Sequence, residues 1–147
     1  IMNSLSDGRV AIGAQAVGFA QGAFDLAVAY AQERTAFGKR IIDHQAPAFR
    51  LADMALKIDI ARTYVMRVAG MIDRGEPCAA EASMAKLYAG EISEQVCSEA
   101  IQIFGGYGYV EETGVARHYR DTRVCQIYEG TNDMQRLVIA RSLGHVA

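Results

Sequence analysis

The sequence has only two prolines and no large excess of either charge, and each of these features narrows the possible folds and functions. Both prolines, Pro47 and Pro77, stand near the beginnings of segments with helical periodicity, where the missing N–H costs no hydrogen bond. Lys and Arg number 15 against 17 for Asp and Glu, which gives a formal net charge of −2. This balance provides no general attraction to nucleic acid or anionic lipid, and no apolar run approaches the ~20 residues of a membrane helix. We expect neither nucleic acid nor a membrane as a partner.

Cysteine is also scarce, and the pattern of the cysteines excludes two common roles. The three cysteines, Cys78, Cys97 and Cys125, are odd in number and widely spaced, and no histidine stands near them at a spacing typical of metal ligands. Free cysteine is among the most buried residue types and usually packs as a small hydrophobe. The sequence therefore predicts structural thiols and no bound metal.

The amount of apolar side chain is sufficient for a globular core. Hydrophobic residues make up 51% of the 147 residues and charged residues 22%, so we expect one folded domain over residues 1–147. The chain begins at Ile1 rather than at Met, and we interpret it as a segment of a longer protein. Under that interpretation, the lack of a targeting signal carries no meaning.

Helical periodicity recurs along most of the chain. Apolar residues about 3.6 positions apart predict long helices over residues 10–34, 51–75 and 78–104, and shorter ones over 115–128 and 132–143. The apolar positions expected to face the core are Ala14, Val17, Phe24, Val28 and Ala31, then Leu51, Met54, Ile58, Val65 and Ile72, then Ala85, Ala89, Ile92, Val96, Ala100 and Ile103. No alternating strand pattern is evident. The sequence predicts an all-α fold, an antiparallel four-helix bundle with a short additional C-terminal helix.

Three stretches carry candidate chemistry, each with a structural alternative. In "QIYEGTNDMQR", Glu129 is either a solvated acid near a helix N-terminus or a general base presented beside Gly130, where backbone can approach a ligand closely. In "QERTAFGKRIIDHQ", the basic cluster around Arg34 either complements a helix dipole or binds an anion, with Phe37 against a planar ring. "QIFGGYGY" is either a helix stop or a phosphate-binding turn.

Taken in order, these stretches resemble the C-terminal helical domain of the acyl-CoA dehydrogenases. The resemblance runs over residues 5–143 and is carried by "DGR" before an Ala-rich helix, "ERTAFGK" followed by "HQ", "QIFGGYGY", "RDTRVCQIYEGT" and "QRLVIAR". It implies an FAD-dependent enzyme that converts an acyl-CoA to a trans-2-enoyl-CoA. Glu129 would take the pro-R proton from the α-carbon while a hydride leaves the β-carbon for flavin N5.

The resemblance also implies roles for other residues. The positions that match FAD contacts across a dimer interface are Arg34, Phe37 and Gln45, with Gln102, Gly105 and Gly106 near the adenosine portion. Thr131 and Asp133 match positions beside the flavin of their own subunit. Arg9 matches a position near the thioester end of the substrate, and Gly130 leaves room for the substrate.

Three positions depart from the family pattern. Several relatives have Asp where this chain has Ser6, some have Thr where it has Ala36, and a Gln or Glu is frequent where it has Asp133. None of these departures removes the expected base or the expected flavin-facing arginine.

The resemblance further implies a homotetramer built as a dimer of dimers, an electron-transfer flavoprotein as electron acceptor, and a cytoplasmic or mitochondrial-matrix location. The isolated segment is expected to fold and self-associate but to be inactive, because the flavin also needs a β-domain that the segment does not contain. Two alternatives stay open. One is an acyl-CoA oxidase of the same fold, and the other is a non-catalytic helical oligomerisation module.

Overall fold

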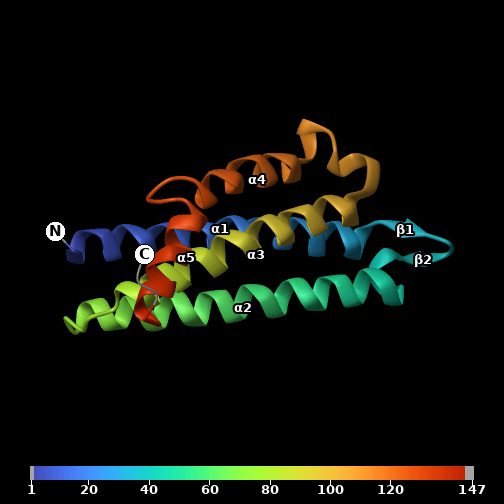
Figure 1. The fold of residues 1–147 in the computed structure, drawn as a ribbon. Coiled ribbons are helices and arrows are strands. Elements are labelled where there is room, and N and C mark those ends of the chain that lie inside the picture. Colours follow the sequence, from blue (N-terminus) through green and yellow to red (C-terminus); the bar gives the residue numbers. More distant parts are fainter. Residues whose placement is uncertain (1, 145–147) are drawn as a thin grey trace.

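The computed structural model describes residues 2–144 and consists almost entirely of helices. The five α-helices are α1 (Met2–Glu33), α2 (Gln45–Asp73), α3 (Ala79–Phe104), α4 (Val115–Thr122) and α5 (Asn132–Ser142). The shorter elements are the strands β1 (Thr35–Ala36) and β2 (Lys39–Arg40) and the 3₁₀ turns η1 (Ile41–Asp43), η2 (Gly105–Gly108), η3 (Glu111–Thr113) and η4 (Arg123–Gln126). Helices α1 to α4 run alternately in opposite directions, and α5 packs beside α3 near the N-terminal end of α1 (Figure 1). This confirms the predicted bundle with a short additional helix.

Alanine forms most of the buried face of α1. Every one of Ala16, Ala20, Ala23, Ala27 and Ala31 has an exposed fraction of 0%, at spacings of three and four residues. Such small side chains let α3 approach α1 closely, and these two helices form the most extensive helix contact. Ala14, which was predicted to face the core, is exposed. In a helix so rich in alanine, residue type alone did not distinguish the inward face from the outward one.

The predicted core faces of the next two helices are confirmed. On α2, Leu51, Met54, Ile58 and Val65 are buried and Ile72 is partly buried. On α3, all six predicted positions are buried: Ala85, Ala89, Ile92, Val96, Ala100 and Ile103. The helical spacing of apolar residues therefore identified both inward faces correctly, with bulky side chains on α2 and a mixture of alanine and bulky side chains on α3.

Three predicted element boundaries were wrong, and one feature was missed. Helix α2 begins at Gln45, well before the predicted start at residue 51. Helix α1 begins at Met2, so Arg9 lies inside the helix rather than at its start. Helix α4 ends at Thr122 and continues as the 3₁₀ turn η4. The strands β1 and β2 form a hairpin whose turn residues, Phe37 and Gly38, have φ values of 52° and 81°. Two-residue strands are too short to show an alternating pattern in the sequence.

Gly108 in η2 packs against the end of α3 without room for a side chain. A Cβ atom there would lie 2.5 Å from the carbonyl oxygen of Ile101 and 2.9 Å from Cβ of Phe104. We expect Gly108→Ala to lower the free energy of unfolding by about 1–3 kcal/mol, since overpacking forces the backbone to shift. Urea unfolding followed by circular dichroism measures this. Gly106→Ala is the control, because a Cβ there meets no described atom within 4 Å; equal unfolding midpoints for the two variants would contradict the packing argument.

The three cysteines are free thiols in the interior, as predicted. Burial raises the pKa of all three thiols, and for Cys97, which is fully buried, it raises the pKa to about 12. Because the thiolate is the reactive form, we expect Ellman's reagent at pH 8 to label essentially none of the thiols in the native protein and all three after unfolding in guanidinium. Rapid labelling of native Cys97 would show that α1 and α3 separate readily.

Within residues 2–144, no helix has the combination of length and apolar character that a membrane crossing requires. In the same part of the chain, no group of three or more His, Cys, Asp or Glu side chains is arranged to hold a metal ion.

Candidate functional site

The predicted site residues divide into two groups at opposite ends of the bundle. Glu129 reaches α1 at Gly8, near the N-terminus of that helix, whereas Arg34 follows its last residue. Gly8 and Arg34 are 26 positions apart, which corresponds to about 39 Å at the ~1.5 Å rise of an α-helix. Gly105 and Gly106 lie at the Arg34 end, because α1 and α3 run in the same direction (Figure 1). Gly130, Thr131, Asp133 and Arg9 lie at the Glu129 end.

Glu129 has an unusual backbone conformation. Its φ is 53° and that of Gly130 is 89°, so two consecutive residues occupy the left-handed region. For a residue with a side chain this conformation costs about 1–2 kcal/mol, and it persists only where the surroundings determine it. A Cβ atom on Gly8 would lie 2.7 Å from Oε2 of Glu129. The glycine in α1 therefore makes the space that the carboxylate occupies.

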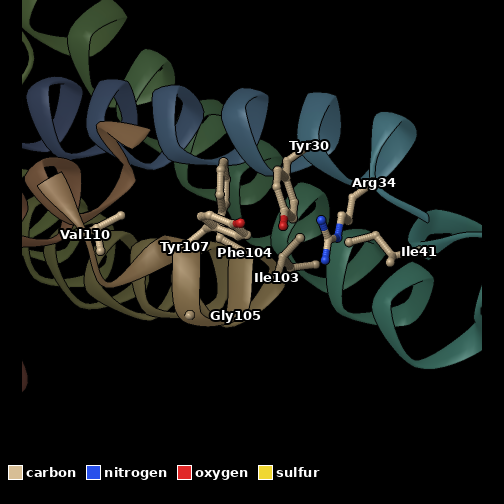
Figure 2. Close-up of a pocket in the computed structure, with 9 residues that line it drawn as sticks. Tyr30, Arg34, Ile41, Ile103, Phe104, Gly105, Tyr107 and Val110 are labelled. Carbon is tan, nitrogen blue, oxygen red and sulfur yellow. The ribbon is translucent and has the colours of Figure 1, made fainter. Parts of the chain in front are cut away.

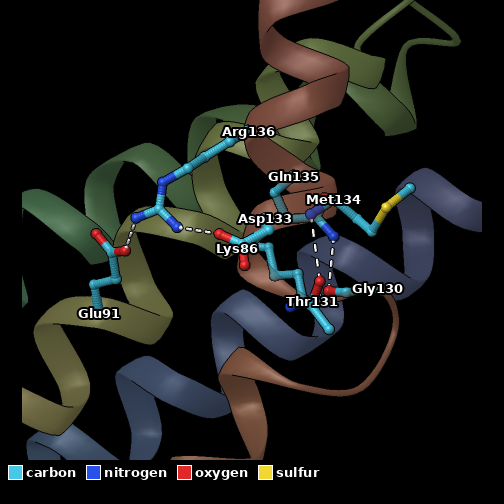
Figure 3. A network of polar contacts seen from close by, with 8 residues as sticks. All are labelled: Lys86, Glu91, Gly130, Thr131, Asp133, Met134, Gln135 and Arg136. Atoms are coloured by element: carbon cyan, nitrogen blue, oxygen red, sulfur yellow. Dashed lines mark hydrogen bonds and ion pairs between the residues drawn. The ribbon is translucent and has the colours of Figure 1, made fainter.

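The carbonyl groups of this turn are bound by two fully buried polar side chains. Lys86 of α3 donates from Nζ to the Gly130 oxygen at 2.6 Å. Gln135 of α5 donates from Nε2 to the same oxygen at 2.9 Å and to the Glu129 oxygen at 3.3 Å. Both side chains have an exposed fraction of 0%. Figure 3 shows α3 and α5 approaching the turn from two sides.

Sequence analysis did not single out Lys86 or Gln135. The available signal for Lys86 was a charged residue in the run "SMAKLYAG", immediately after the predicted core position Ala85. That signal is weak, because a lysine in a helix usually reaches water with its ammonium group. Gln135 gave no signal, since a glutamine in a short amphipathic helix is ordinarily exposed.

The buried ammonium of Lys86 lies among other ionisable groups. Burial lowers the pKa of Lys86. Cys125 raises this pKa, the positive charge of Arg9 lowers it further, and Glu129 raises it. Arg9 is partly buried on α1, and within residues 2–144 its buried Nε has no hydrogen-bond partner. Arg9 and Glu129 therefore both lie near the Lys86 ammonium, and Arg9 directly follows Gly8, against which the Glu129 carboxylate lies.

Thr131 and Asp133 continue the same surface. Thr131 is the N-cap of α5: its Oγ1 accepts a hydrogen bond from the backbone N–H of Met134 at 3.4 Å. The hydroxyl proton of Thr131 is not used in that bond and remains available to a ligand. Asp133 has a side chain that is 93% exposed and pairs with Arg136 at 3.2 Å. Arg136 also pairs with Glu91 of α3, which fastens the start of α5 to the bundle (Figure 3).

At the other end of the bundle, an open pocket of about 520 Å³ lies between the C-terminal ends of α1 and α3. Its lining comprises Tyr30, Arg34, Ile41, Ile103, Phe104, Gly105, Gly106, Tyr107 and Val110 (Figure 2). The guanidinium carbon of Arg34 lies 5.8 Å from the centre of the Tyr107 ring, and Tyr30 stacks on Phe104. A Cβ on Gly105 or Gly106 would meet no described atom within 4 Å, so their backbone is open to a ligand. A cation, accessible backbone and aromatic rings therefore converge here.

Three predicted cofactor residues at this end lie outside the pocket lining. Phe37 projects from the hairpin turn with 98% of its surface exposed. Gln45 is the exposed first residue of α2, and Gln102 is exposed on the last turn of α3. A fully exposed phenylalanine buries no apolar surface, and a positive φ is unfavourable for a residue with a side chain. Both features are consistent with a contact between Phe37 and a molecule outside the chain.

The comparisons with known proteins agree with one another. Residues 1–144 match the family described as "Acyl-CoA dehydrogenase, C-terminal domain". Subunit CarC of the caffeyl-CoA reductase-Etf complex of Acetobacterium woodii is 50% identical over 142 residues, which cover 97% of this chain and 38% of CarC. The human mitochondrial short-chain specific acyl-CoA dehydrogenase is 49% identical over 145 residues, 99% of this chain and 34% of that protein.

A solved structure gives the same result for the fold. Butyryl-CoA dehydrogenase from Megasphaera elsdenii superposes with a TM-score of 0.96 at 44% identity, over 98% of this chain and 38% of that chain. In each comparison the chain spans less than two fifths of the length of the similar protein.

Proposed function

This chain belongs to the acyl-CoA dehydrogenase family, as its C-terminal helical domain, and from that membership we propose that it completes the active site of a longer FAD-dependent enzyme. The proposed reaction is the α,β-dehydrogenation of an acyl-CoA thioester to a trans-2-enoyl-CoA. The proposed base is Glu129. In this proposal the segment by itself is inactive, because the residues that it supplies are only part of the site.

The observation that carries the proposal is the fixed geometry of the turn around Glu129. The α-proton of a thioester is very weakly acidic, so a base must be held close to it and in a reactive orientation. Lys86 and Gln135 hold the backbone of the turn, and Gly8 leaves the space in which the carboxylate lies. A surface acid that served only the helix dipole would need neither the left-handed conformation nor the two buried donors.

The environment of Glu129 also limits what this chain can do by itself. The residue is exposed on the described surface. Removal of a carboxylate from water strengthens it as a base. That desolvation would come from the substrate and from other parts of the enzyme, while this chain supplies the position.

The Arg34 pocket fits an FAD because Arg34 can pair with phosphate and the open backbone of Gly105 and Gly106 can approach a nucleotide. Bound FAD would supply the acceptor for the hydride that leaves the β-carbon. Phe37, Gln45 and Gln102 would contact it outside the pocket. At the Glu129 end, Thr131 would donate its free hydroxyl proton to a second FAD molecule, with Asp133 beside it, and Arg9 and Gly130 would face the thioester.

The distance between the two groups supports a homo-oligomer. About 39 Å along α1 exceeds the length of an extended FAD, so one cofactor cannot reach both Arg34 and Glu129 of the same chain. Each FAD would therefore contact two copies of this chain. A dimer is the smallest assembly that satisfies both groups, and we propose the dimer of dimers that the family resemblance implies.

The electron acceptor and the location are part of the same proposal. The similarity to CarC, a subunit of a complex with Etf, supports an electron-transfer flavoprotein as the acceptor. The similar proteins include bacterial and mitochondrial members, which supports a cytoplasmic or mitochondrial-matrix location.

The test is anaerobic mixing of the full-length enzyme with saturated acyl-CoAs of short to long chain length, while the absorbance of FAD is followed. We expect bleaching and formation of the enoyl-CoA with at least one of them. No bleaching with any chain length would refute the proposal, and purification without flavin would favour the oligomerisation module. Rapid reoxidation of the reduced enzyme by oxygen would instead identify the acyl-CoA oxidase alternative.

A further inference from the structure

We propose that Lys86 and Gln135 are positioning residues for Glu129, which hold the two carbonyl groups of the Glu129–Gly130 turn and so keep the base in its left-handed conformation. The inference rests on the proposed function for the role of Glu129. It goes beyond that function because it assigns a task to two buried side chains on different helices, α3 and α5.

The burial of Lys86 requires an explanation that packing does not supply. An ammonium group loses its hydration inside a protein, and this loss is tolerated only where hydrogen bonds and opposite charges compensate for it. The hydrogen bond that Lys86 makes to Gly130, at 2.6 Å, spans 44 positions of the sequence. An apolar side chain of the same length would fill the space without the desolvation cost, so the lysine is explained by what its ammonium holds.

Gln135 holds the same carbonyl from a different helix. Its Nε2 lies 2.9 Å from the Gly130 oxygen, and a Cβ on Gly130 would lie only 2.8 Å from that nitrogen. A side chain at position 130 would therefore crowd the Gln135 amide, and the φ of 89° also favours glycine there. The Gly130 oxygen accepts two hydrogen bonds, which matches its two lone pairs.

The result is a turn of three residues in which every residue is fixed from outside the turn. The Glu129 oxygen is bound by Gln135, the Gly130 oxygen by Lys86 and Gln135, and Thr131 is held as the cap of α5. A non-glycine residue leaves the left-handed region when these constraints are removed. Loss of the constraints would let the Glu129 carboxylate move away from Gly8 and from the reacting carbon.

The first experiment replaces the ammonium with an apolar group of similar length, Lys86→Met, in the full-length enzyme. We expect FAD retention and the Kd for acyl-CoA to stay within about threefold, while the rate of flavin reduction falls on the order of 10²-fold, because a base displaced by ~1 Å reacts far more slowly. Hydrogen exchange should also accelerate at the amides of Met134 and Gln135, which donate to Thr131 at the end of the turn, in the substrate-free enzyme.

Ser93→Ala is the matched control. Ser93 is also on α3, is also fully buried, and shares a hydrogen bond with Thr122 of α4, away from the Glu129 turn. Its replacement should lower stability while flavin reduction and exchange at the turn stay within about twofold of wild type. A wild-type rate in Lys86→Met, or an equal loss in Ser93→Ala, would overturn the positioning role.

A second variant makes the test independent of how well Lys86→Met folds. Gln135→Met should also slow flavin reduction, and the double variant should be no more than about threefold slower than the slower single variant, because both side chains act on one turn. If the rate loss of the double variant equals the product of the two single rate losses, or if Gln135→Met reduces flavin at the wild-type rate, the shared role is contradicted. Glu129→Gln separates the two proposals. If this variant still reduces flavin, the proposed function fails. If it is inactive while Lys86→Met and Gln135→Met reduce flavin at the wild-type rate, only the positioning role fails.

Discussion

Glu129→Gln is expected to abolish reduction of FAD by acyl-CoA while the enzyme still binds both molecules. Glutamine keeps the shape of the side chain and its fit against Gly8, but it cannot accept the proton. General-base catalysis typically contributes about 10² to 10⁴ in rate, and loss of the only base for so weak an acid should reach at least the upper end. Anaerobic stopped-flow measurement of FAD absorbance after mixing with a saturated acyl-CoA determines the rate.

Glu112→Gln is the control for this variant. Glu112 is an exposed acid in η3, in the connection between α3 and α4. Its replacement should leave the rate within about threefold, since an exposed substitution usually changes stability by no more than ~0.5 kcal/mol. Rapid bleaching by the Glu129 variant would mean that the base lies on another segment.

Arg34→Ala is expected to weaken FAD retention far more than it lowers folding stability. A charge-assisted hydrogen bond to phosphate contributes about 1.5–3 kcal/mol, which corresponds to roughly a 10- to 100-fold weaker Kd. If Arg34 only complemented the dipole of α1, it would contribute about 0.3–1 kcal/mol, and that contribution would be to folding stability rather than to FAD binding. Arg34 is exposed, so its removal leaves the core unchanged. Dialysis followed by the ratio of flavin to protein absorbance measures retention.

The chain offers a close control for this experiment. Arg67 of α2 is exposed and its guanidinium lies 5.5 Å from the centre of the Tyr64 ring, which repeats the arrangement of Arg34 over Tyr107 at 5.8 Å. Arg67→Ala removes a similar cation–π contact outside the pocket and should retain FAD like the wild type. Equal FAD content in all three proteins after dialysis would exclude the cofactor role of Arg34.

The inward faces of α2 and α3 were predictable from the regular helical spacing of their apolar residues. On α2 these residues are bulky; on α3 three of the six are alanine, and all six are buried. Helix α1 was harder, since an alanine such as Ala14 costs little free energy whether buried or exposed. The hairpin around Phe37 was missed because two-residue strands are held by their turn and not by a pattern of side chains.

The candidate site was predictable only where it is local. Glu129, Gly130 and the cap Thr131 are consecutive in the sequence, so a short motif was enough to single them out. The residues that hold them, Lys86 and Gln135, become visible only when α3 and α5 meet. A buried polar residue is explained by its partner, and a single sequence does not name partners that lie 44 positions away.

The separation of the two residue groups along α1 predicts how two inactive variants of the protein would behave when they form a mixed dimer in one cell. In the proposed dimer, a chain with Glu129→Gln would lack the base of its own site but would still supply an intact Arg34 to the FAD of its neighbour. A chain with Arg34→Ala has the reverse defect. In a mixed dimer, one site collects both lesions and the other receives none, so two defective gene copies should complement each other. Two lesions at the same end of the bundle should not complement each other, so co-expression of two inactive variants would show which end of the bundle each one damages.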